Sequence, residues 1–189
     1  MLYFADMSKP KPRRLDFIVD KLSNSIEDTS SGKALDTRVI RFYPADAVKL
    51  DPKSWLFDWR KEIELNDREV FALTTLEKPD IIQGLISISD RSDHIFMNLL
   101  ESAEFNVGKG KQYEGVAGNL VAFACHRSFL NSYDGNVAFD SKTKLIEHYE
   151  KSLGAKRIGA NRMFINTDEA RKLVQKYIKS FDRHGSEPT

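Results

Sequence analysis

The sequence predicts an α/β (α+β) domain with a mixed, mostly antiparallel sheet and helices on both faces. Three consecutive strand-like runs, 69–76, 81–89 and 94–103, are joined by short polar connections, which is typical of an antiparallel meander. After these runs, helical and strand patterns alternate along the chain. The runs 94–103 and 136–140 flank an apolar helical segment, which indicates a βαβ crossover with one parallel pair of strands.

The other elements are predicted from hydrophobic spacing and from residues typical of helix ends. Helices are expected at 14–23, 51–65, 115–130, 142–153 and 167–181, and further strands at 37–43 and 162–166. Asp51 followed by Pro52 is a typical helix start, and Gly154 a typical helix end. Trp55 and Trp59 are four residues apart, which favours a core stripe over the lining of an acceptor pocket.

The remaining segments divide the chain. Residues 24–33 are rich in Ser, Asp and Gly and are expected to form a loop. We expect an N-terminal extension over 1–32, a single domain over 33–181 and a polar tail over 182–189.

Composition limits the classes of function. With 189 residues, 41% hydrophobic, the chain suits one globular domain, and a net charge of +1 gives no overall attraction to nucleic acid or to anionic membranes. We therefore expect neither partner. The single cysteine, Cys125, rules out a disulfide within the chain and fits a cytoplasmic protein. The four histidines are too scattered to suggest a metal site.

Residues 108–125, GKGKQYEGVAGNLVAFAC, begin with three glycines and end in an apolar segment. A glycine-bearing loop that leads into a buried helix presents backbone N–H groups at the positive end of the helix dipole, which predicts a phosphate site. The loop lacks the Lys-Ser/Thr of a P-loop, and Tyr113 stands where a dinucleotide fingerprint needs its third glycine. It does match the pattern Q/R-x-x-G-x-G/A at 112–117.

With this pattern between a long strand and a helix ending in HYEKSLGA, the chain resembles the GNAT superfamily of acetyl-CoA-dependent N-acetyltransferases, and within it an uncharacterised bacterial branch. The resemblance covers roughly 37–181 and is most specific over 99–120 and 136–155. It implies a parallel βαβ unit around the CoA site and direct attack by a small-molecule or peptide amine in a ternary complex. The alternative is a non-catalytic CoA-binding or protein-interaction module on the same fold.

The resemblance also implies which residues bind the donor. Backbone N–H groups over 112–118 would hold the CoA pyrophosphate, and the thioester would lie beside the strand at 99–102. The predicted donor-binding residues are Leu99, Leu100, Ser102, Gln112, Tyr113, Glu114, Gly115, Val116, Ala117, Gly118 and Asn119. The connection before Gln112 is longer than in the family, so Lys109 and Lys111 could contact phosphate.

Two residues are candidates for proton transfer. Tyr149 stands where the family has the acid that protonates the departing thiolate, although it also continues an apolar helix stripe, as a core tyrosine would. Glu101 is the candidate base, and its alternative is a structural ion pair with a Lys or Arg. The period of two places Glu101 on the same side as Ile95, Met97 and Leu99, and Asn98 and Ser102 on the other.

Overall fold

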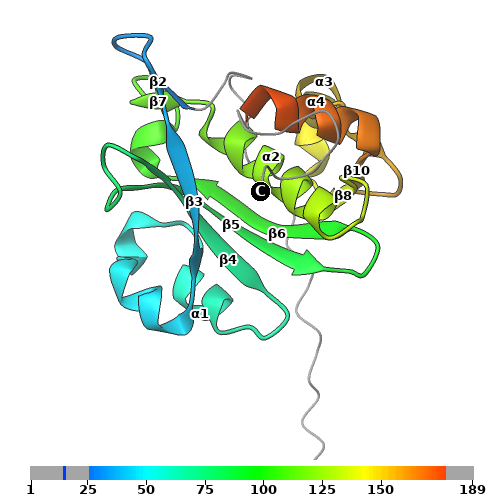
Figure 1. Ribbon diagram of the computed structural model, residues 1–189, viewed down its shortest axis with the longest axis horizontal. Coiled ribbons are helices and arrows are strands. Elements are labelled where there is room, and N and C mark those ends of the chain that lie inside the picture. Colours follow the sequence, from blue (N-terminus) through cyan, green and yellow to red (C-terminus); the bar gives the residue numbers. More distant parts are fainter. Residues whose placement is uncertain (1–14, 16–25, 178–189) are drawn as a thin grey trace, which may run out of the picture.

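The computed structural model describes Leu15 and residues 26–177. Its main element is a seven-stranded sheet with helices on both faces, in the order β3-β4-β5-β6-β8-β10-β9 (Figure 1). The predicted fold class is confirmed. The strands of this sheet are β3 (Thr37–Phe42), β4 (Glu69–Thr75), β5 (Ile82–Asp90), β6 (Ile95–Ser102), β8 (Val137–Asp140), β9 (Lys156–Arg157) and β10 (Arg162–Ile165).

The predicted βαβ unit lies at the centre of the sheet. Neighbouring strands pair antiparallel, except β6 and β8, which are parallel and are connected through helix α2 (Val116–Leu130). Their pairing runs from Ile95 opposite Val137 to Met97 opposite Phe139. The antiparallel meander of β4, β5 and β6 is also confirmed.

Helices cover the two faces of the sheet unequally. Helix α2 lies on one face together with the later helices, and the residues of this α2 face form the larger apolar cluster (Figure 1). The opposite α1 face carries shorter helices over a smaller cluster. The helices are η1 (Pro44–Lys49), η2 (Pro52–Ser54), α1 (Trp59–Ile63), η3 (Glu104–Asn106), α2, η4 (Thr143–Leu145), α3 (Ile146–Leu153) and α4 (Thr167–Tyr177).

A small second sheet joins the N-terminal part of the chain to the segment before α2. It consists of β1 (Ile26–Asp28), β2 (Ala34–Leu35) and β7 (Tyr113–Glu114), with β1 in the middle. The prediction of a loop over 24–33 is therefore wrong for β1. A three-residue strand is too short to show a period, and one of its two partners, β7, is distant in sequence.

The predicted helix over 51–65 is also wrong in part. Asp51 caps the short η2 as expected, but Trp55 has extended dihedral angles and α1 begins only at Trp59, after its cap Asp58. The expected helix is interrupted because the N–H groups of Leu56 and Phe57 donate to the Glu101 carboxylate on β6 instead of to helix carbonyls. Trp55 and Trp59 thus do not share a helix face.

The helices expected at 115–130 and 142–153 and the start of the last helix at Thr167 are confirmed, and Gly154 ends α3 with φ +64°. The predicted helix over 14–23, apart from Leu15, the end of the last helix after Tyr177 and the polar tail lie outside the described residues. Within the described part of the chain, no helix has the length and apolar character needed to cross a lipid bilayer.

Candidate functional site

The sheet opens between β6 and β8. Their pairing ends at Met97 and Phe139, although β6 continues to Ser102. Just beyond β8, the Ser141 N–H donates to the Asn161 carbonyl on the β10 side. We call the space between residues 98–102 of β6 and residues 140–142 the sheet opening. Residues 99–102, where the thioester was predicted to lie, form one side of it.

A β-bulge in β6 reverses its faces just before the opening. Ser87 of β5 pairs with Leu99, but the next residue, Ile88, pairs with Met97, so Asn98 is the extra residue. As a result, Met97 belongs to the cluster on the α2 face and Leu99 to the cluster on the α1 face. The prediction that Glu101 shares a side with Met97 is wrong, because a period of two does not continue through a bulge.

Asn98 lies opposite Met97, as predicted, but on the same face as Leu99. Its amide donates to the Ser89 hydroxyl at 2.9 Å, and that hydroxyl donates to the Asp67 carbonyl at 2.7 Å, next to α1. Asn98 and Glu101 therefore lie on the same α1 face. The expected opposition between them is wrong for the same reason, the bulge.

Glu101 is buried and accepts three hydrogen bonds from the segment that precedes α1. Its Oε1 accepts from the Leu56 N–H at 2.6 Å, and its Oε2 accepts from the Phe57 N–H at 3.3 Å and from Trp59 Nε1 at 2.7 Å. All three donors are neutral groups. The alternative role of Glu101, a structural ion pair with Lys or Arg, is therefore wrong: the carboxylate is held by hydrogen bonds from neutral N–H groups. A carboxylate offers about four lone-pair sites, and three of them are in use.

The segment held by Glu101 borders a hollow of about 650 Å³ on the α1 face. Trp55, Phe57 and Trp59 are among its lining residues, with the charged side chains of Asp58 and Arg60. Trp59 is buried, whereas Trp55 is only partly covered. The predicted core role thus fits Trp59, whereas Trp55 lines the hollow with part of its surface exposed.

Tyr149 lies beside the sheet opening. It is fully buried on α3, and its ring packs edge-on against Phe139, with centroids 5.3 Å apart. Phe139 is the last residue of β8 that pairs with β6. The core packing expected of Tyr149 is therefore present, and it places the residue where the two strands part. The neighbouring His148 has a pKa below its ordinary value because it is partly buried.

The first turn of α2 meets part of the expectation for an anion site. Gly115 is the N-cap with φ +85°, a left-handed conformation that favours glycine. The N–H groups of residues 116–118 have no acceptor within the helix. Two other N–H groups of the predicted cradle are already used: that of Gln112 donates to the Phe105 carbonyl at 2.8 Å, and that of Tyr113 to Asn106 Oδ1 at 3.3 Å.

Side chains near this turn also have partners. Asn119 Nδ2 donates to the Gly115 carbonyl at 3.0 Å, and Lys111 lies 3.4 Å from a Glu114 carboxylate oxygen. A Cβ on Gly118 would lie 2.0 Å from the hydroxyl oxygen of Tyr177. The close approach of α4 therefore explains why residue 118 is a glycine. The sequence pattern alone had attributed the lack of a side chain there to the close approach of a phosphate group.

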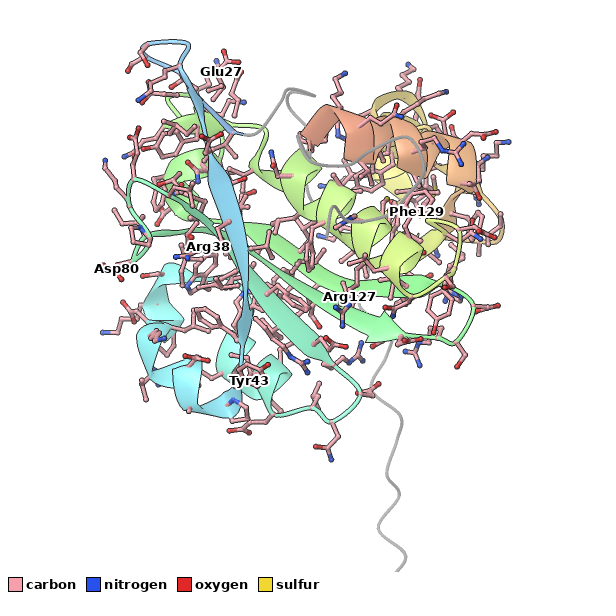
Figure 2. The ribbon with its side chains drawn as sticks, in the orientation of Figure 1. Glu27, Arg38, Tyr43, Asp80, Arg127 and Phe129 are labelled. Atoms are coloured by element: carbon pink, nitrogen blue, oxygen red, sulfur yellow. The ribbon has the colours of Figure 1, made fainter. Side chains whose placement is uncertain are left out.

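The turn between β1 and β2 binds the segment before α2, a contact that sequence reasoning missed. The Thr29 N–H donates to the Gln112 carbonyl at 2.9 Å and its hydroxyl to the Lys111 carbonyl at 2.6 Å. Figure 2 shows Glu27 of β1 at this end of the molecule, and Arg127 and Phe129 toward the other end of α2. The run DTSSG at 28–32 predicts a turn, but no local pattern indicates that this turn contacts Lys111 and Gln112.

Comparison with known proteins identifies the fold. A scan of protein-family models and a search of curated proteins each give no match. Among solved structures, mutant forms of the spermidine/spermine N-acetyltransferase SpeG from Vibrio cholerae match with a TM-score of 0.50 and 15% identity, over 72% of this chain and 98% of that one. AtaTR bound with AcCoA matches with a TM-score of 0.51 and 14% identity, over 73% and 98%. The chain has the GNAT fold.

A third GNAT-like structure bears on partners. The KacTA–DNA complex matches with a TM-score of 0.50 and 12% identity, over 74% of this chain and 99% of that one. Because it was solved with DNA, the comparisons give no support to the prediction that this chain has no nucleic acid partner. The residue roles predicted for the GNAT site stay predictions.

Proposed function

We propose that the chain is an N-acetyltransferase that transfers the acetyl group of acetyl-CoA to a small-molecule or peptide amine. One observation carries this proposal: the sheet opens between the parallel strands β6 and β8, beside the N-terminus of α2 and next to Tyr149. The GNAT fold supports the same class of reaction.

In this proposal, donor binding depends mainly on the backbone. Acetyl-CoA would supply an activated acetyl thioester. Main-chain groups of β6 residues 99–102 would bind its extended pantetheine arm, because strand β8 does not pair with them. The N–H groups of residues 116–118 would bind the pyrophosphate at the positive end of the helix dipole. Within the predicted cradle over 112–118, the N–H groups of Gln112 and Tyr113 already donate to other residues. The proposal therefore places the pyrophosphate at the first turn of α2.

The proposed chemistry needs one base and one acid. Glu101, directly or through a water molecule, would accept a proton from the amine, whose nitrogen then forms a bond to the acetyl carbon. As the carbon–sulfur bond breaks, the Tyr149 hydroxyl would donate its proton to the thiolate. The remaining lone-pair site of Glu101 makes this role possible without loss of its three bonds to the chain.

The test is binding of acetyl-CoA by calorimetry, followed by release of free thiol with a panel of amines. Tyr149→Phe should lower kcat by about 10²- to 10⁴-fold and leave the Kd for CoA unchanged. Tyr133→Phe is the matched control, because Tyr133 donates to Asp90 at the far end of the sheet. Full activity of Tyr149→Phe would contradict the acid role. CoA binding without turnover of any amine would favour the non-catalytic module.

A further inference from the structure

Leu15 is bound to the edge of the strand segment that follows β8. Its N–H donates to the Asp140 carbonyl at 2.5 Å, and its carbonyl accepts from the Lys142 N–H at 3.1 Å, which makes a parallel bridge opposite Ser141. Its side chain is 1% exposed and belongs to the apolar cluster on the α2 face. Both the main chain and the side chain of Leu15 are therefore held by the domain.

The edge that Leu15 occupies faces β6. Ser141 directs its N–H to Asn161, on the β10 side. Since main-chain groups alternate in direction along a strand, the groups of Asp140 and Lys142 point the other way, into the sheet opening. Phe139 is level with Met97, so Ser141, two residues further on, is about level with Leu99. Leu15 thus lies in the opening at the level predicted for the thioester.

Leu15 takes the place of a neighbouring strand at this level, through its bonds to Asp140 and Lys142. Adjacent strands are about 4.8 Å apart, and Leu15 occupies the strand position next to β8. A pantetheine arm is also an extended chain with amide groups, and it would need the same space. Tyr149, the proposed acid, is fully buried in this arrangement.

We propose that Leu15 is an intramolecular plug of the donor site, which must leave the sheet opening before the pantetheine arm can enter. This inference rests on the proposed function, because it assumes that CoA binds in the opening. The apparent affinity for CoA then equals the affinity of the open molecules multiplied by the fraction of molecules in which Leu15 has left the opening. If that fraction is about a tenth, displacing Leu15 strengthens CoA binding about tenfold.

The test is calorimetric titration of CoA into full-length Leu15→Asp. A charge cannot stay in an apolar cluster without a partner, so this variant should expel residue 15 and bind CoA with a Kd about tenfold lower than that of the original chain. Val48→Asp is the matched control, because Val48 is 81% exposed on η1, and it should leave the Kd unchanged. An unchanged or higher Kd for Leu15→Asp would overturn the plug.

A second variant and a second readout guard against misfolding. Leu15→Pro keeps an apolar side chain but removes the N–H that donates to Asp140. Hydrogen exchange at the Lys142 amide, which donates to Leu15, should be slow in the original chain and faster in both variants. Slow exchange at Lys142 in a variant that binds CoA more tightly would show that residue 15 still occupies the opening, which overturns the plug. If CoA binds to none of these proteins, the proposed function fails instead.

Discussion

The two faces of the sheet are closed by different kinds of contact. On the α2 face, helix α2 buries apolar side chains such as Leu120 and Val121, and burial there raises the pKa of the Cys125 thiol. On the α1 face, two buried carboxylates hold the covering segment through hydrogen bonds: Glu62 accepts from the Ser87 hydroxyl at 2.7 Å, and Glu101 accepts from residues 56–59.

This difference suggests that the two faces have different roles: one stabilises the domain, and the other positions the segment beside the hollow. Apolar contacts are non-directional and scale with buried area, so the α2 face mainly determines whether the domain folds. Hydrogen bonds to a carboxylate are directional, so the α1 face determines where Leu56 and Phe57 lie beside the hollow. A variant on the α2 face should reduce stability without moving that segment, and a variant on the α1 face should move it at a smaller cost in stability.

The largest effect is expected on the α2 face. Leu120→Ala removes a fully buried side chain and leaves a cavity, so the free energy of unfolding should fall by about 2 to 5 kcal/mol. Leu130→Ala, on the same helix but 43% exposed, should cost far less. Urea unfolding measures both. Equal losses would mean that burial against the sheet does not decide the stability of α2.

The next effect belongs to Glu101. Glu101→Gln weakens three hydrogen bonds and should cost about 2 to 3 kcal/mol, with faster amide exchange at Leu56 and Phe57. Exposed Glu104→Gln is the control. The pH profile of kcat/KM separates the two roles of Glu101: a general base loses its acidic limb when changed to Gln, whereas a residue that only positions the segment keeps it.

A smaller loss is expected at Ser87. Ser87→Ala removes the hydroxyl that donates to buried Glu62, so the free energy of unfolding should fall by about 1 to 2 kcal/mol. Exposed Ser54→Ala should change it by less than about 0.5 kcal/mol. Equal unfolding midpoints in guanidinium for Ser87→Ala and the original chain would show that the Ser87 bond does not stabilise the α1 face.

The smallest effect is expected at an exposed polar turn. Hydrogen bonds from Ser30 and Ser31 lower the pKa of Asp28 to about 2, from 3.8 in the unfolded chain. The folded pKa is the lower one, so this contribution to stability is present above about pH 4 and is lost as the pH falls toward 2. Asp28→Asn should remove that part of the pH dependence. Melting temperatures between pH 5 and 2.5 that run parallel in both proteins would contradict it.

The sequence predicted elements whose signal lies within one segment. The apolar run of α2, the meander from β4 to β6, the Gly154 helix end and the start of α4 at Thr167 all depend on residues a few positions apart. The order of these elements was enough to predict the parallel pair β6 and β8. Within the site, the role of Tyr149 was expected from the resemblance to the GNAT superfamily, and its core packing from the apolar stripe of its helix.

Tertiary structure decided the contacts that join distant segments. Glu101 binds Leu56, 45 residues away, on the face of β6 opposite to the one predicted, because one bulge residue changes the register. Gly118 is small because Tyr177 packs on it, and Leu15 lies at the sheet opening through bonds to residues 140 and 142. Hydrophobic periodicity is local and can be read along the chain, whereas register and hydrogen-bond partners exist only once the segments have come together.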